Sequence, residues 1–189
     1  MTGISITTDK KQLKRLKRKL GNLKDKTPVA MRRAINEAAR KARTEMDRNT
    51  REKYFMKRKF IFGSLHTDLA RGGNLRARIS SKGKAIPLAE FRTNPAKPNP
   101  KRRKPIRIQV KRGGGAKALN KDPKAFVAIL KGEKVIAERT SGRRGPLKGL
   151  FGPSVPSVMK NDEILSGVEE AARKKLAERL EHHISHLLK

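Results

Sequence analysis

The stretch TPVAMRRAINEAARKARTEM, residues 27–46, predicts the long helix on which the fold depends. Thr27 followed by Pro28 is a favourable N-cap with proline at the first helical position, where no amide hydrogen is needed. Apolar side chains then recur with helical spacing, at Met31, Ala34, Ile35, Ala38, Ala42 and Met46. Because alanine is small, this stripe lets a neighbouring helix or sheet approach closely. We therefore expect a packed helix over residues 28–51.

The chain is unusually basic. Its 189 residues include 49 Lys and Arg against 17 Asp and Glu, so the formal net charge is +32, and only 35% of the residues are hydrophobic. Such charge opposes compaction unless an anionic or acidic partner neutralises it. Cysteine is absent, which excludes disulfides, Cys-based zinc sites and thiol nucleophiles. No secretory pattern and no run of about 18 apolar residues occurs, so we expect a soluble protein made in a cytoplasm, without a membrane partner.

Two further amphipathic helices are predicted, one before and one after this stretch. Leucines at 13, 16, 20 and 23 predict a short basic helix within residues 1–26, ahead of an α+β domain over residues 27–189. Residues 161–188 predict a second long helix, with apolar residues on one face and acids near its start. This segment is nearly neutral, since residues 161–189 contain six acids and five Lys or Arg.

Short segments of strand type lie between the two long helices. Leu75, Ala77 and Ile79 alternate with polar residues, and IPLAEF, IRIQV, FVAIL and KVIAER follow. The spacers are too short for parallel crossovers. We therefore predict an α+β fold in which an antiparallel sheet of about four or five strands is packed on one face by both long helices. Residues 53–74 are compatible with either a short helix or a strand.

A proline-rich basic segment interrupts these strands. RTNPAKPNPKRRKP, residues 92–105, contains four prolines and predicts a long exposed loop or arm. Sixteen Lys and Arg but only one acid, Glu90, lie between Asp68 and Asp122. Few aromatic residues are present, which disfavours base stacking and favours contact with phosphates. We expect double-stranded DNA or an acidic protein surface to contact Arg102, Arg103, Lys104, Arg107, Lys111 and Arg112. A solvated basic loop is the alternative.

No motif of an enzyme or a metal site is found. His182 and His186 are spaced i, i+4, but HExxH is absent, and histidines late in a helix favour interaction with its dipole. GxSxG, P-loop and GxGxxG patterns are also absent. We expect no enzymatic activity, no metal and no cofactor.

The segment GLFGPSVPSVMKND, residues 149–162, is apolar and contains two prolines. We call residues 149–160 the elbow. Its glycines allow turns and its prolines stiffen an extended path, so its apolar side chains favour either core lining or a subunit contact. We assign a subunit contact to Leu150, Phe151, Val155 and Val158.

The order of these segments resembles the prophage minor tail protein Z family of lambda-like tailed phages, also called tail completion proteins. The resemblance covers most of residues 28–188, and its most specific part is the elbow. It rests on AMRRAINEAARKARTEM, GKAIPLAEFR, IRIQVKRGGG, AFVAIL and GRRGPLKGLFGPSVPSVM, followed by the terminal helix.

This resemblance implies a structural virion protein without catalytic residues. It implies assembly in the host cytoplasm into a homo-oligomeric ring, with a hexamer as the best guess, at the neck or head-proximal end of a long tail. Other tail and neck proteins would be its partners. Two alternatives stay open, a nonspecific nucleic-acid-binding accessory protein and an assembly chaperone that is absent from the virion.

Overall fold

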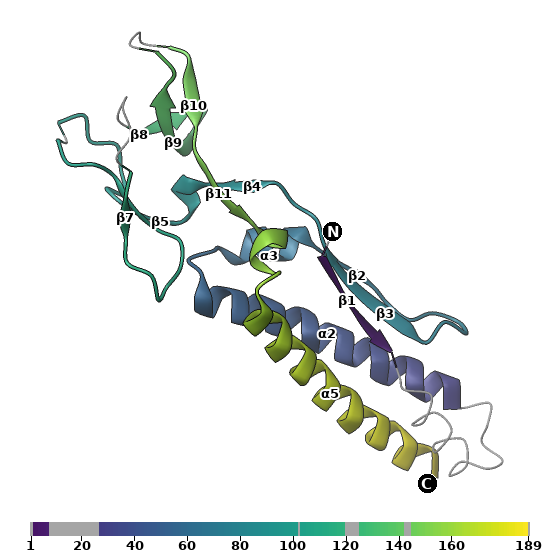
Figure 1. Ribbon diagram of the computed structural model, residues 1–189. Coiled ribbons are helices and arrows are strands. Elements are labelled where there is room, and N and C mark those ends of the chain that lie inside the picture. The colour runs from purple at the N-terminus through teal and green to yellow at the C-terminus, as the bar shows by residue number, and fades with distance from the viewer. Residues whose placement is uncertain (1, 8–26, 102, 120–124, 142–144, 189) are drawn as a thin grey trace. The chain divides into compact units, whose positions relative to one another are not determined.

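The computed structural model describes residues 2–7, 27–101, 103–119, 125–141 and 145–188, and its fold is α+β. The chain divides into two compact units (Figure 1). The first comprises Met1–Asn49, Gly63–Lys82 and Met159–Lys189, and the second Thr50–Phe62 and Gly83–Val158. The basic helix expected around residues 9–23 lies outside the described residues. Its separation from an α+β domain over residues 27–189 stays a prediction.

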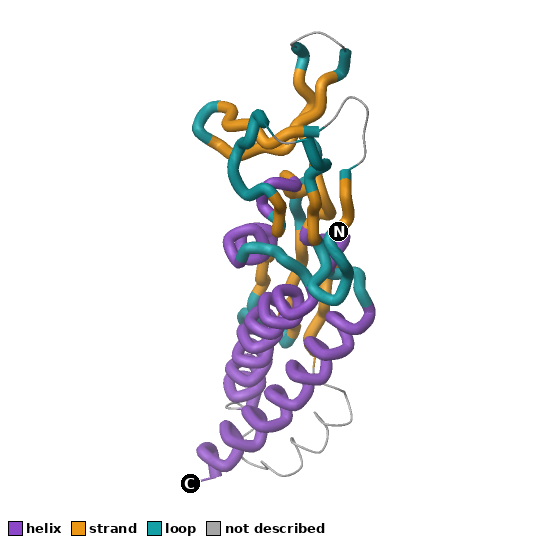
Figure 2. The backbone as a smooth tube through the Cα atoms, turned by 90° about the vertical axis from the view of Figure 1, so that its left-hand side faces the viewer, coloured by secondary structure: helices purple, strands orange, loops and turns teal. Residues whose placement is uncertain are grey.

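The first unit contains the two predicted long helices, α2 (Thr27–Lys53) and α5 (Asp162–Leu188). Helix α2 begins at the expected cap residue, and the side chain of Thr27 is buried. Glu37 of α2 binds His183 of α5, while Asn49 lies close to Gly167. These pairs show that the helices run antiparallel, as the colours of Figure 1 also show, and Figure 2 shows the two helices side by side.

An antiparallel sheet completes the first unit, in the order β1 (Thr2–Thr7), β3 (Arg76–Ser81), β2 (Leu65–Asp68). Ile4 pairs with Ile79, and Ile6 with Ala77, so the buried residues share one face. Strand β1 was missed by the sequence analysis, because TGISIT is too short to show a clear period.

Both long helices contact the apolar face of this sheet. Met46 of α2, Leu165 of α5 and residues of all three strands, among them Ile4 and Leu65, line one small apolar space. The loop from β2 to β3 is also fixed to α2, since Asn36 donates a hydrogen bond to the carbonyl of Ala70 (3.2 Å) and accepts one from its amide (2.8 Å).

The second unit contains three small antiparallel sheets, ordered β10–β9–β8, β5–β6–β7 and β11–β4. Their strands are β4 (Ala85–Pro87), β5 (Arg92–Asn94), β6 (Arg107–Gln109), β7 (Lys117–Ala118), β8 (Phe126–Leu130), β9 (Glu133–Arg139), β10 (Leu147–Gly149) and β11 (Phe151–Ser154). The short helices are α3 (Arg58–Ser64), which begins in this unit, η2 (Leu88–Glu90) and α4 (Val155–Val158).

The prediction of one sheet with four or five strands is therefore wrong. The segment IPLAEF shows the physical reason. Pro87 has no amide hydrogen to continue a ladder, and the chain turns into η2, where the amide of Leu88 donates to the carbonyl of Leu150 (2.9 Å). With prolines and glycines ending most segments, strands of two to seven residues pair locally instead of joining one sheet.

The proline-rich segment also differs in detail from the expectation. Arg92–Asn94 form β5 and pair with β6, so the strand extends into the part assigned to a loop. Of the described residues between β5 and β6, all are exposed except Pro95 and Ile106. That this connection serves as an arm stays a prediction.

We predict that Ala38→Leu destabilises the protein by about 1 to 3 kcal/mol, because added methylenes have no room at a fully buried position. Arg40→Leu, on the exposed face of the same helix, is the matched control. Thermal and urea unfolding of both variants measures the difference. Equal stability of Ala38→Leu and the native protein would show that α2 is not closely packed.

Candidate functional site

The basic residues assigned to a partner contact gather around the sheet β5–β6–β7 of the second unit. Arg103 and Lys104 lie in the exposed connection before β6, Arg107 is an exposed residue of β6, and Lys111 follows that strand. Arg102 lies outside the described residues. The guanidinium of Arg107 donates to the carbonyl of Ala116 at 3.5 Å. Together with Arg112, five of the six predicted residues are thus exposed cations within ten positions of the chain.

The sixth residue, Arg112, has a structural contact that the sequence did not reveal. Its Nε donates to the carbonyl of Arg51 (2.7 Å), and its amide donates to the carbonyl of Lys53 (2.8 Å). Both carbonyls belong to the last turn of α2, where they have no partner within the helix. A cation at this end also complements the negative end of the helix dipole. Arg112 therefore caps α2.

Two aromatic residues after α2 complete this capping contact. Phe55 donates its amide to the carbonyl of Val110 (2.8 Å), and Tyr54 forms a bridge with Lys111. The Arg112 guanidinium lies 4.4 Å from the centre of the Phe55 ring, and that of Arg92 lies 5.4 Å away. The sequence analysis left this segment unassigned. The only available signal was the pair of aromatic residues directly after the helix.

The four residues assigned to a subunit contact divide into two groups. Leu150, Val155 and Val158 are buried within the chain, with exposed fractions of 9%, 2% and 3%, whereas Phe151 is 59% exposed. Gly152 permits this packing, because a Cβ at this position would lie 2.7 Å from the Phe91 ring. Of the four, Phe151 therefore has the side chain that a partner could bury, and its role in a subunit contact stays a prediction.

The histidines of α5 take part in a link between the long helices. His183 lies 2.9 Å from the carboxylate of Glu37, which also pairs with Arg179. Partial burial raises the pKa of the Glu37 carboxyl, but hydrogen bonds from Arg179 and His183 outweigh it, so the pKa lies below its usual value. The link thus stabilises the fold above the unfolded-state pKa of Glu37, and this contribution is lost as the pH falls through the folded-state pKa.

The described part of the chain shows no group of three His, Cys, Asp or Glu residues that could hold a metal ion. The rings of His182 and His186 stack edge to face, with centres 5.6 Å apart. Within the same residues, no helix has the length and apolar character needed to cross a membrane.

These features describe a small α+β protein with a net charge of +32 and many exposed cations. The chain belongs to the prophage minor tail protein Z (GPZ) family, whose model matches residues 11–189. No curated protein and no solved structure matches it. The resemblance seen in the sequence is confirmed. The family gives the chain a structural role in a phage tail, and such a role requires no catalytic group.

We predict that Arg112→Ala lowers the free energy of unfolding by about 1 kcal/mol, because it removes a charged hydrogen bond at the end of α2. Arg103→Ala removes the same charge from an exposed connection and serves as the control. Chemical unfolding compares the two variants. An Arg112→Ala variant no less stable than Arg103→Ala would contradict the cap.

Proposed function

We propose that the protein is a tail completion component, placed at the neck or head-proximal end of a long phage tail. It forms a homo-oligomeric ring, with a hexamer as the favoured state, and assembles in the host cytoplasm with other tail and neck proteins. The observation that carries this proposal is the family match over residues 11–189. The exposed Phe151 on a highly charged chain supports the ring, because a large exposed apolar side chain favours burial in a contact.

The ring holds DNA, or an acidic neighbour, through charge alone. Support comes from the exposed cations Arg103, Lys104, Arg107 and Lys111 and from the net charge of +32. In the described part of the chain the aromatic rings near these cations are engaged within the fold, since Phe55 and Tyr54 lie under Arg112 and Lys111. Neutralisation of phosphates therefore suits this surface better than stacking on bases.

The position in the particle is tested by mass spectrometry and labelled imaging of purified phage. We expect the protein in fixed stoichiometry at the head-proximal end of the tail. Its absence from particles would contradict the proposal. Absence combined with tight, nonspecific DNA binding would favour the accessory nucleic-acid-binding protein.

We predict that Phe151→Ser shifts the purified protein toward the monomer, because the substitution removes an exposed aromatic side chain from the contact. Light scattering coupled to gel filtration measures the mass of the assembly. Leu147→Ser is the control, because Leu147 is an exposed apolar residue of β10, the strand that precedes β11 in the chain. This substitution should leave the mass of the assembly unchanged. An oligomer that survives Phe151→Ser intact removes Phe151 from the contact.

We predict that binding to unrelated DNA duplexes weakens with salt, with a log-log slope of about −4 to −5. The triple variant Arg103→Ala, Lys104→Ala and Arg107→Ala should reduce the steepness by up to about 3, since each lost phosphate contact contributes about 0.9. Removing three exposed cations of the first unit, Arg33, Arg40 and Arg76, is the matched control. Equal salt slopes for the two triple variants would show that the predicted surface does not contact DNA. A strong preference for one duplex would show that recognition does not rest on charge alone.

A further inference from the structure

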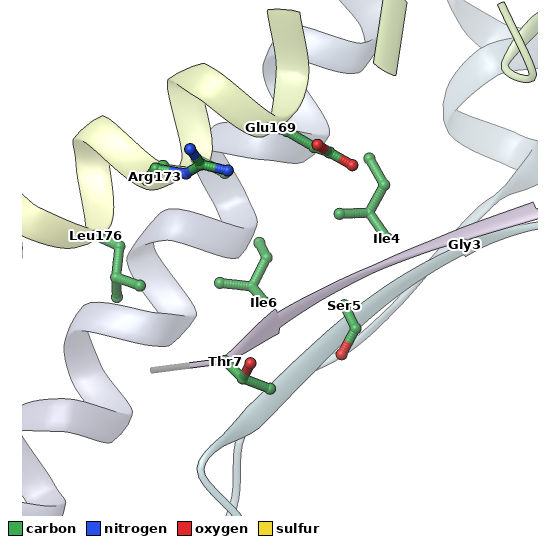
Figure 3. A pocket seen from close by; sticks show the side chains of 9 residues that line it. Gly3, Ile4, Ser5, Ile6, Thr7, Glu169, Arg173 and Leu176 are labelled. Atoms are coloured by element: carbon green, nitrogen blue, oxygen red, sulfur yellow. The ribbon is translucent and has the colours of Figure 1, made fainter. Parts of the chain in front are cut away.

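A groove in the first unit runs along the outer edge of strand β1 (Figure 3). Strand β1 forms one wall, and α5 forms the other with Glu169, Ala172, Arg173 and Leu176. Figure 3 shows Ile4 and Ile6 directed toward α5, while Ser5 is directed away from it. The groove therefore combines an apolar floor with one acidic and one basic side chain on its helical wall.

The outer edge of β1 is a site where another strand can add. Strand β1 pairs with β3 on one side, and no strand of the described residues pairs with its other side. Backbone N–H and C=O groups along such an edge form a template for a further strand. An extended segment that adds there gains backbone hydrogen bonds, and its alternate side chains can pack against the groove floor.

The second unit offers a strand of matching character. Among the described strands, β8 is likewise the edge of its sheet, and its last two residues, Ile129 and Leu130, are 62% and 43% exposed. A tight turn follows, with positive φ at Lys131 and Gly132, so this apolar end stands at the tip of a hairpin.

The charges of the groove and of the hairpin tip are complementary. Glu169 and Arg173 lie four residues apart and therefore on the same side of α5. The exposed residues Lys131 and Glu133 flank Gly132 in the hairpin turn. Residues 161–172 contain four acids and no Lys or Arg, which makes this part of α5 the acidic segment of a chain with net charge +32. A second copy supplies a tip whose lysine can face Glu169 and whose glutamate can face Arg173.

We propose that the groove between β1 and α5 receives the β8 edge and hairpin tip of a second copy of this chain. The contact joins two different surfaces, so every copy binds one neighbour through its groove and another through its hairpin. Contacts of this kind close into rings when the rotation allows. The inference rests on the proposed ring and adds two surfaces to its contact, beside the one assigned to Phe151.

Charge reversal tests the pairing directly. Glu169→Lys and Lys131→Glu should each weaken self-association about tenfold, and the double variant should recover most of the loss because the pair is restored in the opposite sense. Glu170→Lys makes the same change at the neighbouring exposed residue, which does not line the groove, and should leave self-association unchanged. Sedimentation or light scattering over a concentration series measures the dissociation constants.

Cross-linking tests proximity without relying on charge, because the native chain has no cysteine. A variant carrying Ser5→Cys and Ile129→Cys should give a ladder of multimers with a short bismaleimide. A mixture of the two single variants should give heterodimers only. His66→Cys on β2, the opposite edge of the same sheet, replaces Ser5→Cys in the control, which should give no ladder.

The outcomes separate this inference from the proposed function. A native protein that is monomeric at high concentration and in particles overturns both the ring and the groove contact. A native oligomer that is unaffected by Glu169→Lys and gives no ladder overturns the groove contact alone. In that case the ring is built through other surfaces, and the groove is left for a different protein.

Discussion

The close packing of helix α2 is the constraint on which the rest of the structure depends. Ala34, Ala38 and Ala42 are fully buried, and the larger Met46 on the same helix lines an apolar space together with Leu165 of α5 and residues of the sheet β1–β3–β2. The opposite side of the helix keeps its charged residues in water, as Arg40 and Lys41 illustrate. This division of surfaces makes a packed core compatible with a chain in which hydrophobic residues are scarce.

Charge is the second constraint, and two of the few acids link separate segments of the chain. Glu37 joins α2 to α5 through Arg179 and His183, and Glu90 pairs with Lys57 within the second unit. Such pairs neutralise only a small part of the positive charge, since Lys and Arg outnumber the acids by 32. Many of the other cations in the described part of the chain are exposed, and repulsion among them is reduced when anionic groups or acidic surfaces lie next to them. A component of a phage tail has other tail proteins beside it, and acidic surfaces on them would reduce this repulsion.

The capping of α2 shows that one residue of a basic run can stabilise the fold while others of the same run lie in an exposed connection. Arg112 binds carbonyls at the end of the helix and stacks on Phe55, whereas Arg103 and Lys104 lie in an exposed connection. In the sequence, all three are cationic members of one basic run, and nothing there distinguishes them. Their difference arises because the strand β6 leads Arg112, and not the others, to the end of α2.

The sequence by itself determined the two long helices, the antiparallel pairing and the family. Helical spacing repeats over many turns in residues 27–46, and the elbow has a distinctive order of glycine and proline. It also determined the excess of positive charge, because net charge follows from composition alone. Only the tertiary structure decided that the strands form several small sheets, that β1 joins a sheet with β3, and that Leu150, Val155 and Val158 are buried while Phe151 is exposed. The physical reason is that helix patterns depend on neighbours three or four residues apart, whereas strand pairing and burial depend on residues far apart in the chain.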